Sequence, residues 1–438
     1  MIFQKPFKVI VNLTIHRGSK EIGGTCIELQ SKDSKILIDF GLPLIAENKE
    51  PFYSRKIKGQ SVESLFQQGI LPQINGLYRN ESPQFNAILL SHPHPDHYGL
   101  LSFVNPEIPV YMSRGCQILI EVSYFFGQFN YELENIKTVS PWKEFNIGNF
   151  LVTPYLVDHS GFDALAFLIE CNGKRIFYSG DFRGHGRKGI VFENILKKPP
   201  EGIDYLILEG SQIGRTNKGK YKTEQDIEEE LSHLFKNQKE QFFIACSSQN
   251  IDRIVSIYRA CVRSNRIFII DPYTAFILDQ LKVISPNIPQ FDWGENISVF
   301  FVPNSYTERL SEDKSLFKFK SAKITYEEIK AIRNRAVIKD SYNTRKIFAK
   351  RKDMINSILI YSMWEGYLKE SKEFWEKHQV PIIEVHSSGH AYIEELKDFV
   401  RAMKPRYIIP VHTFYPEKYS EYFEGNIKLL KDKDTVEL

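Results

Sequence analysis

Four side chains of the types that bind metal ions fall within six consecutive positions of this sequence. They are His92, His94, Asp96 and His97, directly after the apolar run 87–90. Alternate side chains of an extended backbone point the same way, so His92 and His94 can reach one ion. Asp96 and His97 follow in a turn and point toward a second ion. A single buried histidine is more often a hydrogen-bonded core residue, but that alternative does not explain the whole H-x-H-x-D-H pattern.

Three further donors stand where apolar runs end. His159 closes LVTPYLVDHS, Asp181 closes RIFYSGD, and His412 closes RYIIPVHT. Strands that end at polar residues deliver those residues to loops at one edge of a sheet. With His386 and His390, which follow the apolar run PIIEV, seven of the eleven histidines lie in such strand-end motifs, which random scatter does not produce. We therefore expect a metal site assembled from distant parts of the chain.

The elements that position these residues change character along the chain. Short β-rich runs dominate the first 210 residues, and Ser113 is expected to cap a helix that runs to Phe125. After Glu209, strands and helices alternate, with a capping-box pattern at Thr223 and Asp226. Strands that finish in histidines return after residue 378. We predict one domain at 1–210 and 379–438, interrupted by a small parallel α/β domain at 211–378.

The composition is that of an ordinary soluble globular protein, with 42% hydrophobic and 25% charged residues. No charge-free apolar run is long enough to span a membrane, and the N-terminal residues alternate like a strand rather than a secretory signal. The cytoplasm is the expected location. The five cysteines are widely spread without a C-x-x-C pair, so reduced, buried thiols are expected.

The net charge of +3 is too small to indicate a nucleic-acid binder by itself. The charge is unevenly distributed, however, because residues 304–353 contain fourteen Lys or Arg and seven Asp or Glu. Such a local excess attracts a polyanion. A solvated, lysine-rich helical surface explains it equally well.

Together these motifs resemble the metallo-β-lactamase superfamily, and more narrowly its β-CASP branch of nucleases, which includes ribonuclease J, Artemis and the endonuclease of pre-mRNA cleavage. The resemblance runs from GSKEIGGTCIEL to the final VHT. It implies an α/β fold, the metallo-β-lactamase αββα sandwich with an inserted β-CASP α/β domain. It also implies that one ion is bound by His92, His94 and His159, and the other by Asp96, His97 and His412, with Asp181 bridging both.

Two features resemble the β-CASP branch in particular. The strand DYLILEG ends in Glu209, at the acidic position that orients a metal-ligand histidine in that branch. The run from His386 to Ala391, HSSGHA, is similar to its S-G-H-A signature, in which His390 would contact the scissile phosphate. Alternatively, His390 supports the metal site indirectly and does not contact the substrate. Thr413 and Phe414 depart from the pattern, because Gly-Glu commonly follows this histidine in ribonuclease J.

Two divalent ions about 3.5–4 Å apart suit phosphodiester hydrolysis, because one can hold hydroxide while both neutralise charge on phosphate oxygens. Zinc suits the imidazole-rich donor set, and manganese suits the second position nearly as well. We expect a ribonuclease, acting internally or from a 5′ end, whose catalytic residues are Asp96, His390 and Glu209. The rival hypotheses are a DNA nuclease of the Artemis type, a hydrolase of a small ester, thioester or cyclic nucleotide, and a nucleic-acid-binding subunit without catalysis.

Residues outside the metal site are candidates for binding the substrate. A strand-to-helix junction can bind phosphate at the helix N-terminus, although an ordinary N-cap explains the same residues. The loop DFRGHGRKG offers further cationic groups, or it is a surface loop. The partner is expected to be RNA rather than DNA, with the oligomeric state left open and a homodimer among the options. The substrate-binding candidates are Ser247, Ser248, Asn250, His386, Ser387 and Ser388.

Overall fold

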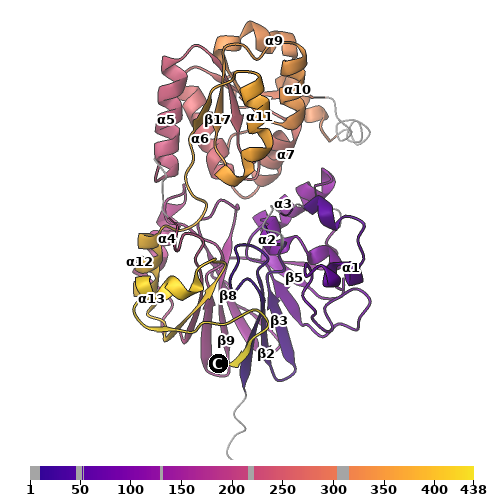
Figure 1. Cartoon of the computed structure of the whole chain (residues 1–438), viewed down its shortest axis with the longest axis vertical. Coiled ribbons are helices and arrows are strands. Elements are labelled where there is room, and N and C mark those ends of the chain that lie inside the picture. The colour runs from indigo at the N-terminus through magenta and orange to yellow at the C-terminus, as the bar shows by residue number, and fades with distance from the viewer. Residues whose placement is uncertain (1–9, 46–51, 53, 129–131, 216–220, 303–314) are drawn as a thin grey trace, which may run out of the picture.

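The computed structural model describes residues 10–45, 52, 54–128, 132–215, 221–302 and 315–438 of the chain. Figure 1 shows two lobes stacked along the long axis of the molecule. The chain builds most of the first lobe, passes through the second, and returns to the first near its C-terminal end. Among the described residues, no helix combines the length and the apolar character that a bilayer span requires.

Two seven-stranded sheets form the centre of the first lobe. In β1, Val11, Leu13 and Ile15 are buried and the residues between them are half-buried, the period of two expected for a strand with one covered face. The first sheet contains, in spatial order, β21 (Thr435–Glu437), β1 (Val11–Arg17), β2 (Cys26–Ser31), β3 (Ser34–Ile38), β4 (Ala87–Leu89), β5 (Val110–Ser113) and β6 (Ile136–Val139). The second sheet contains β20 (Asn426–Ile427), β19 (Tyr407–Val411), β11 (Tyr205–Glu209), β10 (Lys174–Tyr178), β9 (Leu165–Cys171), β8 (Phe150–Leu156) and β7 (Phe145–Ile147).

The facing sides of these two sheets share one hydrophobic core, to which Leu13 and Ile38 contribute from the first sheet and Phe167 and Val411 from the second. Helices cover the outer sides of both sheets. The first sheet is covered by α1 (Val62–Gln67) and α3 (Arg114–Phe125), and the second by α4 (Gly189–Lys197), α12 (Ile393–Met403) and α13 (Tyr419–Tyr422). The layers are therefore helix, sheet, sheet and helix, and the predicted αββα sandwich is confirmed.

A third seven-stranded sheet forms the second lobe, and every strand pair in it is parallel. Parallel sheets are buried on both faces, and this one has helices on each side. Its strands, in spatial order, are β15 (Lys323–Ile324), β14 (Ile297–Phe300), β13 (Ile267–Ile270), β16 (Ala336–Lys339), β12 (Gln241–Ala245), β17 (Ser357–Tyr361) and β18 (Ile382–Glu384). One face is covered by α5 (Glu224–Asn237), α6 (Ile251–Arg263) and α7 (Pro272–Leu281), the other by α9 (Tyr326–Ala331), α10 (Tyr342–Lys350) and α11 (Lys369–Lys377).

Local sequence signals at helix starts are confirmed. The Ser113 side chain caps α3, and Thr223 and Asp226 form a capping box at the start of α5. The strand expected after residue 378 is placed differently. Residues 382–384 pair with β17 and extend the third sheet, whereas the sequence pattern assigned them to the first lobe. The helix α11 leads into a parallel neighbour of β17, which is the usual crossover of such a sheet.

Candidate metal centre

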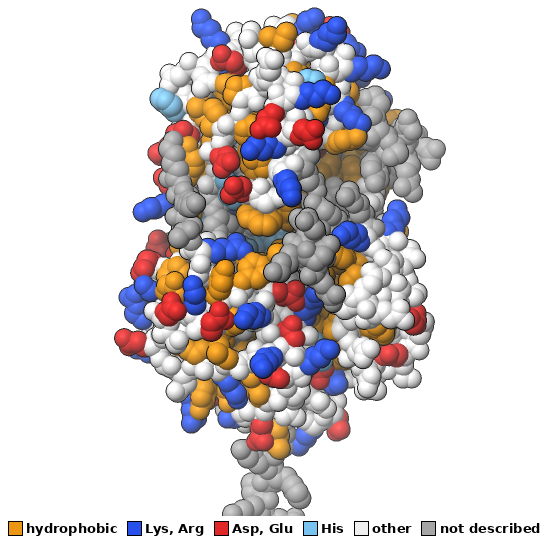
Figure 2. Space-filling view, viewed as in Figure 1, with side chains coloured by type: hydrophobic (Ala, Val, Ile, Leu, Met, Phe, Trp, Pro, Cys, Tyr) orange, Lys and Arg blue, Asp and Glu red, His pale blue; other side chains and the backbone are white. Residues whose placement is uncertain are grey.

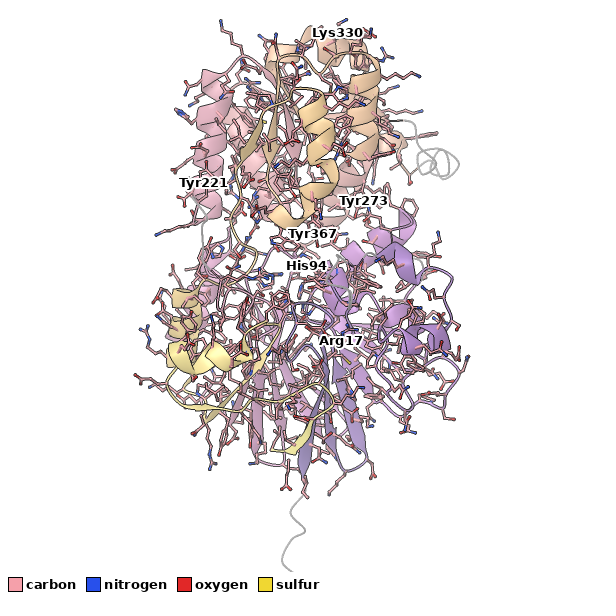
Figure 3. The ribbon with its side chains drawn as sticks, viewed as in Figure 1. Arg17, His94, Tyr221, Tyr273, Lys330 and Tyr367 are labelled. Atoms are coloured by element: carbon pink, nitrogen blue, oxygen red, sulfur yellow. The ribbon has the colours of Figure 1, made fainter. Side chains whose placement is uncertain are left out.

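The H-x-H-x-D-H motif begins three residues after the end of β4, at the edge of the first sheet that faces the second lobe. His94, with an extended backbone, is the N-cap residue of the short helix α2 (Pro95–Tyr98). Pro95 occupies the first helical position, where a missing N–H costs nothing. The helix α2 then presents Asp96 and His97. Figure 3 shows His94 near the junction of the lobes, below Tyr367 of the second lobe.

A close approach of backbone fixes α2 in this place. A Cβ on Gly41, just after β3, would lie 1.6 Å from the carbonyl oxygen of Asp96. Phe40 donates a backbone hydrogen bond to His97, and Leu42 donates one to Pro95. Only glycine leaves room for this contact. The segment after β3 therefore sets the position of Asp96 and His97.

Three histidines form the first donor cluster. His92 Nε2 is 3.1 Å from His94 Nδ1, and His159 Nε2 is 3.2 Å from the same nitrogen. Nitrogens that share a tetrahedral zinc ion with bonds of 2.0–2.1 Å are about 3.3–3.4 Å apart. The three ring nitrogens therefore have the spacing of three ligands to one ion. His159 reaches this cluster from the loop between β8 and β9.

The second cluster contains Asp96, His97, Asp181 and His412, all of them buried. Asp181 Oδ2 is 3.1 Å from His97 Nε2 and 3.4 Å from His412 Nε2. Asp96 Oδ2 is 3.8 Å from the same two nitrogens. Asp181 Oδ2 also lies 3.7 Å from His92 Nε2 of the first cluster. Asp181 therefore stands between the two clusters, where a bridging carboxylate has to be.

Several donor atoms in these clusters lack a partner among the described residues. His159 Nδ1, Asp181 Oδ1 and His412 Nε2 are buried without a hydrogen bond. A buried polar atom without a partner costs stability unless an unseen group satisfies it. Imidazole and carboxylate donors at this spacing, without thiolates, fit two divalent ions. Such ions would provide the partners that the buried atoms of Asp181 and His412 lack.

Asp39 holds two of the histidines in one tautomer, and the sequence analysis missed it. Asp39 Oδ2 lies 2.8 Å from His97 Nδ1, so a proton there leaves His97 Nε2 free to bind an ion. Ser91 donates its hydroxyl to Asp39 and stands 3.0 Å from His92 Nδ1, which can donate to it in turn. Tyr178 donates to the same carboxylate oxygen at 2.6 Å. Asp39 also follows a strand directly, and that was the signal available in the sequence.

The electrostatics of the two clusters differ. Burial lowers the pKa of His92 and His159, and it lowers the pKa of His94 to about 4, so these imidazoles are neutral and able to bind a metal ion. Burial also opposes charge on His97, but Asp181 and Asp39 outweigh it and raise the pKa of His97. Burial lowers the pKa of His412 in the same cluster, so it is at His97, between two carboxylates, that this cluster favours positive charge.

His390 lies beside both clusters but belongs to neither histidine set. Its ring centroid is 5.2 Å from that of His159 and 5.6 Å from that of His412. Its side chain is 24% exposed, whereas His92, His97 and His412 are at most 1% exposed, so a substrate can reach it. Burial opposes charge on His390, but the carboxylates of Glu209 and Asp181 raise its pKa. The group at the open side of the centre is thus a histidine that favours its protonated form.

Glu209 does not contact a histidine of either metal cluster, contrary to the sequence expectation. Glu209 Oε2 accepts hydrogen bonds from the backbone and the hydroxyl of Ser211, both at 2.9 Å. The Ser211 hydroxyl lies 3.1 Å from His390 Nδ1, and Glu209 Oε2 itself lies 3.6 Å from that nitrogen. The histidine that Glu209 orients is therefore His390. Sequence could not identify this partner, because every candidate histidine is far from Glu209 along the chain.

Most of the predicted substrate-binding residues already have partners within the protein. Asn250 caps α6 through Arg253 N, and the Ser248 hydroxyl is 2.8 Å from that of Thr274. These contacts favour the N-cap interpretation of this junction. Ser387 is buried and accepts a hydrogen bond from Arg253, while Ser388 accepts one from the backbone N–H of His390. Ser247 is exposed, His386 is half-buried beside Arg253, and binding by all six stays a prediction.

The cationic residues of the loop 183–187 are paired with carboxylates. They are therefore neither solvent-exposed groups of a surface loop nor groups that are free to bind phosphate. Arg183 is fully buried and contacts Asp158, Asp252 and Glu224. Arg187 pairs with Glu228, and His185 pairs with Glu395. Arg253 also pairs with Glu224, at 2.8 Å. We call this set the arginine cluster: Arg183, Arg187, Arg253, Asp158, Glu224, Glu228 and Asp252.

The basic segment 304–353 is only partly described, because residues 304–314 lie outside the described residues. In the remainder, several cations are paired with carboxylates, including Arg333 with Asp353 and Arg345 with Asp340. Lys339 is buried against Asp271. On the face shown in Figure 2, Lys and Arg are interspersed with Asp and Glu over both lobes. These observations favour the solvated-surface interpretation over a dedicated polyanion patch.

Comparison with known proteins agrees with this geometry. A β-lactamase superfamily domain model matches residues 60–236, and a model of a Zn-dependent metallo-hydrolase RNA specificity domain matches residues 380–426. Ribonuclease J of Mycoplasma genitalium is 22% identical over 429 residues, which are 94% of this chain and 68% of that protein. Ribonuclease J of Helicobacter pylori is 23% identical over 450 residues, 98% of this chain and 61% of that protein.

A crystal structure of a protein of unknown function from Enterococcus faecalis V583 covers 98% of this chain with a TM-score of 0.79 at 20% identity, which shows the fold. The chain belongs to the metallo-β-lactamase superfamily, in its β-CASP branch. The metal-binding character of the site follows from that family and from the donor clusters. The chain spans 61–68% of the length of the two ribonuclease J proteins, so their activity comes to it only as a proposal.

Proposed function

We propose that this chain is a metal-dependent nuclease that hydrolyses phosphodiester bonds of RNA. The observation that carries the proposal is the pair of neighbouring donor clusters, with Asp181 of the second cluster 3.7 Å from His92 of the first and the partly exposed His390 beside both. A hydrolase of small esters needs only the metal centre and has no use for a second lobe, so the second lobe favours a larger substrate. The match of residues 380–426 to an RNA specificity domain supports the RNA alternative.

Each side chain has a defined role in this proposal. One ion is bound by His92, His94 and His159, and a second by Asp96, His97 and His412, with Asp181 between them. Zinc fits this donor set best, and manganese is the alternative for the carboxylate-rich second position. Two bound ions would lower the pKa of a coordinated water toward neutrality and neutralise charge on the phosphate.

Asp39 contributes by fixing ring orientation. Its carboxylate accepts a hydrogen bond from the Nδ1–H of His97 and, through Ser91, favours a proton on His92 Nδ1. The Nε2 lone pairs of both rings then face the cluster interior. A histidine whose tautomer is fixed in this way does not have to reorganise when it binds an ion.

His390 acts on the substrate from the open side of the centre. The relay from Glu209 through Ser211 holds a proton on His390 Nδ1, which leaves Nε2 as the nitrogen that meets the substrate. With its pKa raised, His390 is suited to donate a hydrogen bond or a proton from Nε2 to a phosphate or leaving oxygen. Glu209 is in this view a positioning residue for His390.

The test is cleavage of equal-length RNA and DNA strands with 5′-monophosphate, 5′-triphosphate or 5′-hydroxyl ends by zinc- or manganese-loaded protein. We expect RNA to be cleaved, with early mononucleotides indicating action from an end and internal fragments indicating endonuclease action. The double variant Asp96→Ala, His97→Ala is expected to lose the activity. His233→Ala, an exposed histidine on α5, is the matched control and should keep it.

Three outcomes would contradict the proposal. RNA loss that survives in the double variant would mean that the activity comes from a contaminant. A preference for DNA of more than about tenfold, or roughly 1.4 kcal/mol in transition-state binding, would make the protein a DNA nuclease. Hydrolysis of a small ester or cyclic nucleotide without cleavage of any strand would make it a small-molecule hydrolase.

A further inference from the structure

Arg215 differs from the arginines of the arginine cluster because it has no carboxylate partner among the residues that the structure describes. Within the part of the chain that the structure describes, no Asp or Glu oxygen lies within ion-pair distance of its guanidinium, and its side chain is exposed. Arg183 and Arg253, by contrast, are buried and paired on several sides. A guanidinium without a carboxylate partner keeps its planar set of donors available for an anion.

Aromatic rings from the segment after His412 hold Arg215 in place. The guanidinium carbon lies 5.5 Å from the centroid of the Phe414 ring, within the range of a cation–π contact. The backbone at Gly214 has φ +71° and lies flat against Tyr415, where a Cβ would come within 2.6 Å of the ring. Phe414 and Tyr415 lie two and three residues after His412, so the same segment carries a donor of the second cluster and the rings beside Arg215.

The segment that carries Arg215 is also tied to the His390 side of the centre. It begins at Glu209 and Ser211, which contact His390, and Gln212 donates a hydrogen bond to Ser388 at 3.0 Å. Burial lowers the pKa of Arg215, while the field of Tyr415 and Glu209 opposes that shift, so the group is partly desolvated and close enough to feel Glu209. Partial desolvation strengthens hydrogen bonds from a cation to an anion.

We propose that Arg215, seated on Phe414, binds a backbone phosphate of the substrate strand next to the bond that is cleaved. The inference rests on the proposed nuclease function and assigns a phosphate subsite to residues outside the metal clusters and the 386–390 loop. Arg215 supplies two parallel N–H donors to the phosphate oxygens, and Phe414 limits the freedom that the side chain loses on binding. Tyr415, 37% exposed, lies beside it with a ring that a base can stack on.

The experiment measures binding of a fluorescein-labelled single-stranded RNA by anisotropy, across a range of salt concentrations. All proteins are zinc-loaded and carry His390→Ala, which suppresses cleavage and keeps every proposed metal ligand. Arg215→Ala is expected to weaken binding about tenfold or more, because a charge-assisted hydrogen-bonded contact is lost. Arg215→Ala should also make the slope of log K against the logarithm of the salt concentration shallower by about 0.7. This is the change expected when one phosphate contact on a single strand is lost.

Two further variants separate phosphate binding from structural support. Arg215→Lys keeps the charge without the bidentate geometry, so it should keep the salt slope while binding weakens several-fold. Lys236→Ala removes an exposed cation on α5 and should change neither quantity. Thermal unfolding of each variant is measured in parallel, since a purely structural contact with Phe414 would lower Tm in Arg215→Ala and leave affinity and salt slope unchanged.

The outcomes separate the two proposals. RNA binding and cleavage by the unaltered chain, with an Arg215→Ala affinity and salt slope equal to those of its parent, overturn the inference and leave the nuclease proposal standing. No binding and no cleavage of any strand by the metal-loaded chain overturn both. A loss of affinity with the smaller salt slope supports the subsite.

Discussion

The metal centre and the arginine cluster are both buried and polar, yet they balance their charges in different ways. In the arginine cluster, each guanidinium faces carboxylates, as Arg183 does with Asp158, Asp252 and Glu224. In the metal centre, Asp181 and His412 have buried atoms with no partner among the described residues. A satisfied set of charges is a structural brace, whereas an unsatisfied set of donors is a site for a cation.

The two regions also differ in what they connect. The arginine cluster joins loop 183–187 of the first lobe to α5 and α6 of the second, and Arg183 donates to the carbonyl oxygen of Ser388. The metal centre draws its donors from the two sheets of the first lobe alone. Damage to the cluster should therefore affect stability first, and damage to the centre should affect metal binding and activity first.

The largest effect is expected from Asp181→Asn, which keeps the size of the side chain and removes the shared charge. We expect RNA cleavage to fall on the order of 10³-fold or more, since several kcal/mol of charge stabilisation depend on the ions that Asp181 holds. Metal content measured by mass spectrometry should fall from two ions per chain. Unchanged stoichiometry and activity would show that Asp181 is not shared between the clusters.

The next largest effect is expected from Glu224→Gln in the arginine cluster. Glu224 is 1% exposed and pairs with Arg253 and Arg183, so its loss leaves buried cations uncompensated. We expect a loss of about 3–5 kcal/mol in the free energy of unfolding, with metal content unchanged. Glu229→Gln, an exposed glutamate of the same helix, should change stability by less than about 0.5 kcal/mol. Denaturant titration of both variants measures the difference.

A smaller effect is expected from Asp39→Asn. Asp39 touches no proposed ion site directly but fixes His97 and Ser91 through hydrogen bonds. Removing such a partner typically costs about 10–100-fold in metal affinity or activity. A zinc competition titration checks this, and an affinity equal to that of the unaltered chain would mean that the His97 tautomer is set without Asp39.

The smallest effect concerns pH. Burial opposes ionisation of Glu224, but Arg253 and Arg183 outweigh it and hold its pKa below the usual range. The unfolded chain therefore binds this proton at a higher pH, about 4.3, and the stability is present above that value and lost as pH falls through it. Between pH 4.5 and 3, the free energy of unfolding should fall more steeply than in Glu224→Gln, by up to about 1.4 kcal/mol per pH unit. Equal slopes would contradict the pairing.

Sequence predicted the parts of this molecule that local chemistry determines. The spacing of His92, His94, Asp96 and His97 indicates a metal site without any knowledge of the fold, and Thr223 indicates a helix start because capping is local. The family and the sandwich fold are confirmed by the comparisons and the layers. The assignment of individual ligands to two ions stays a prediction.

Long-range packing determined the rest. Asp39 meets His97 because α2 docks on the segment after β3, and Glu209 meets His390 because the loop at 386–390 lies at the end of β11. The two residues of each pair are far apart in the sequence, so the sequence does not show that they meet. The loop 183–187 looked like free cationic groups, since its carboxylate partners lie as far away as Asp252. The strand at 382–384 belongs to the third sheet because it pairs with β17, and the sequence pattern does not show which sheet a strand joins.

The most direct test of the central claim is the anomalous scattering of a zinc-loaded crystal. We predict two peaks about 3.5–4 Å apart, one among His92, His94 and His159 and the other near His412, with Asp181 between them. A single peak, or peaks bound by other residues, would contradict it.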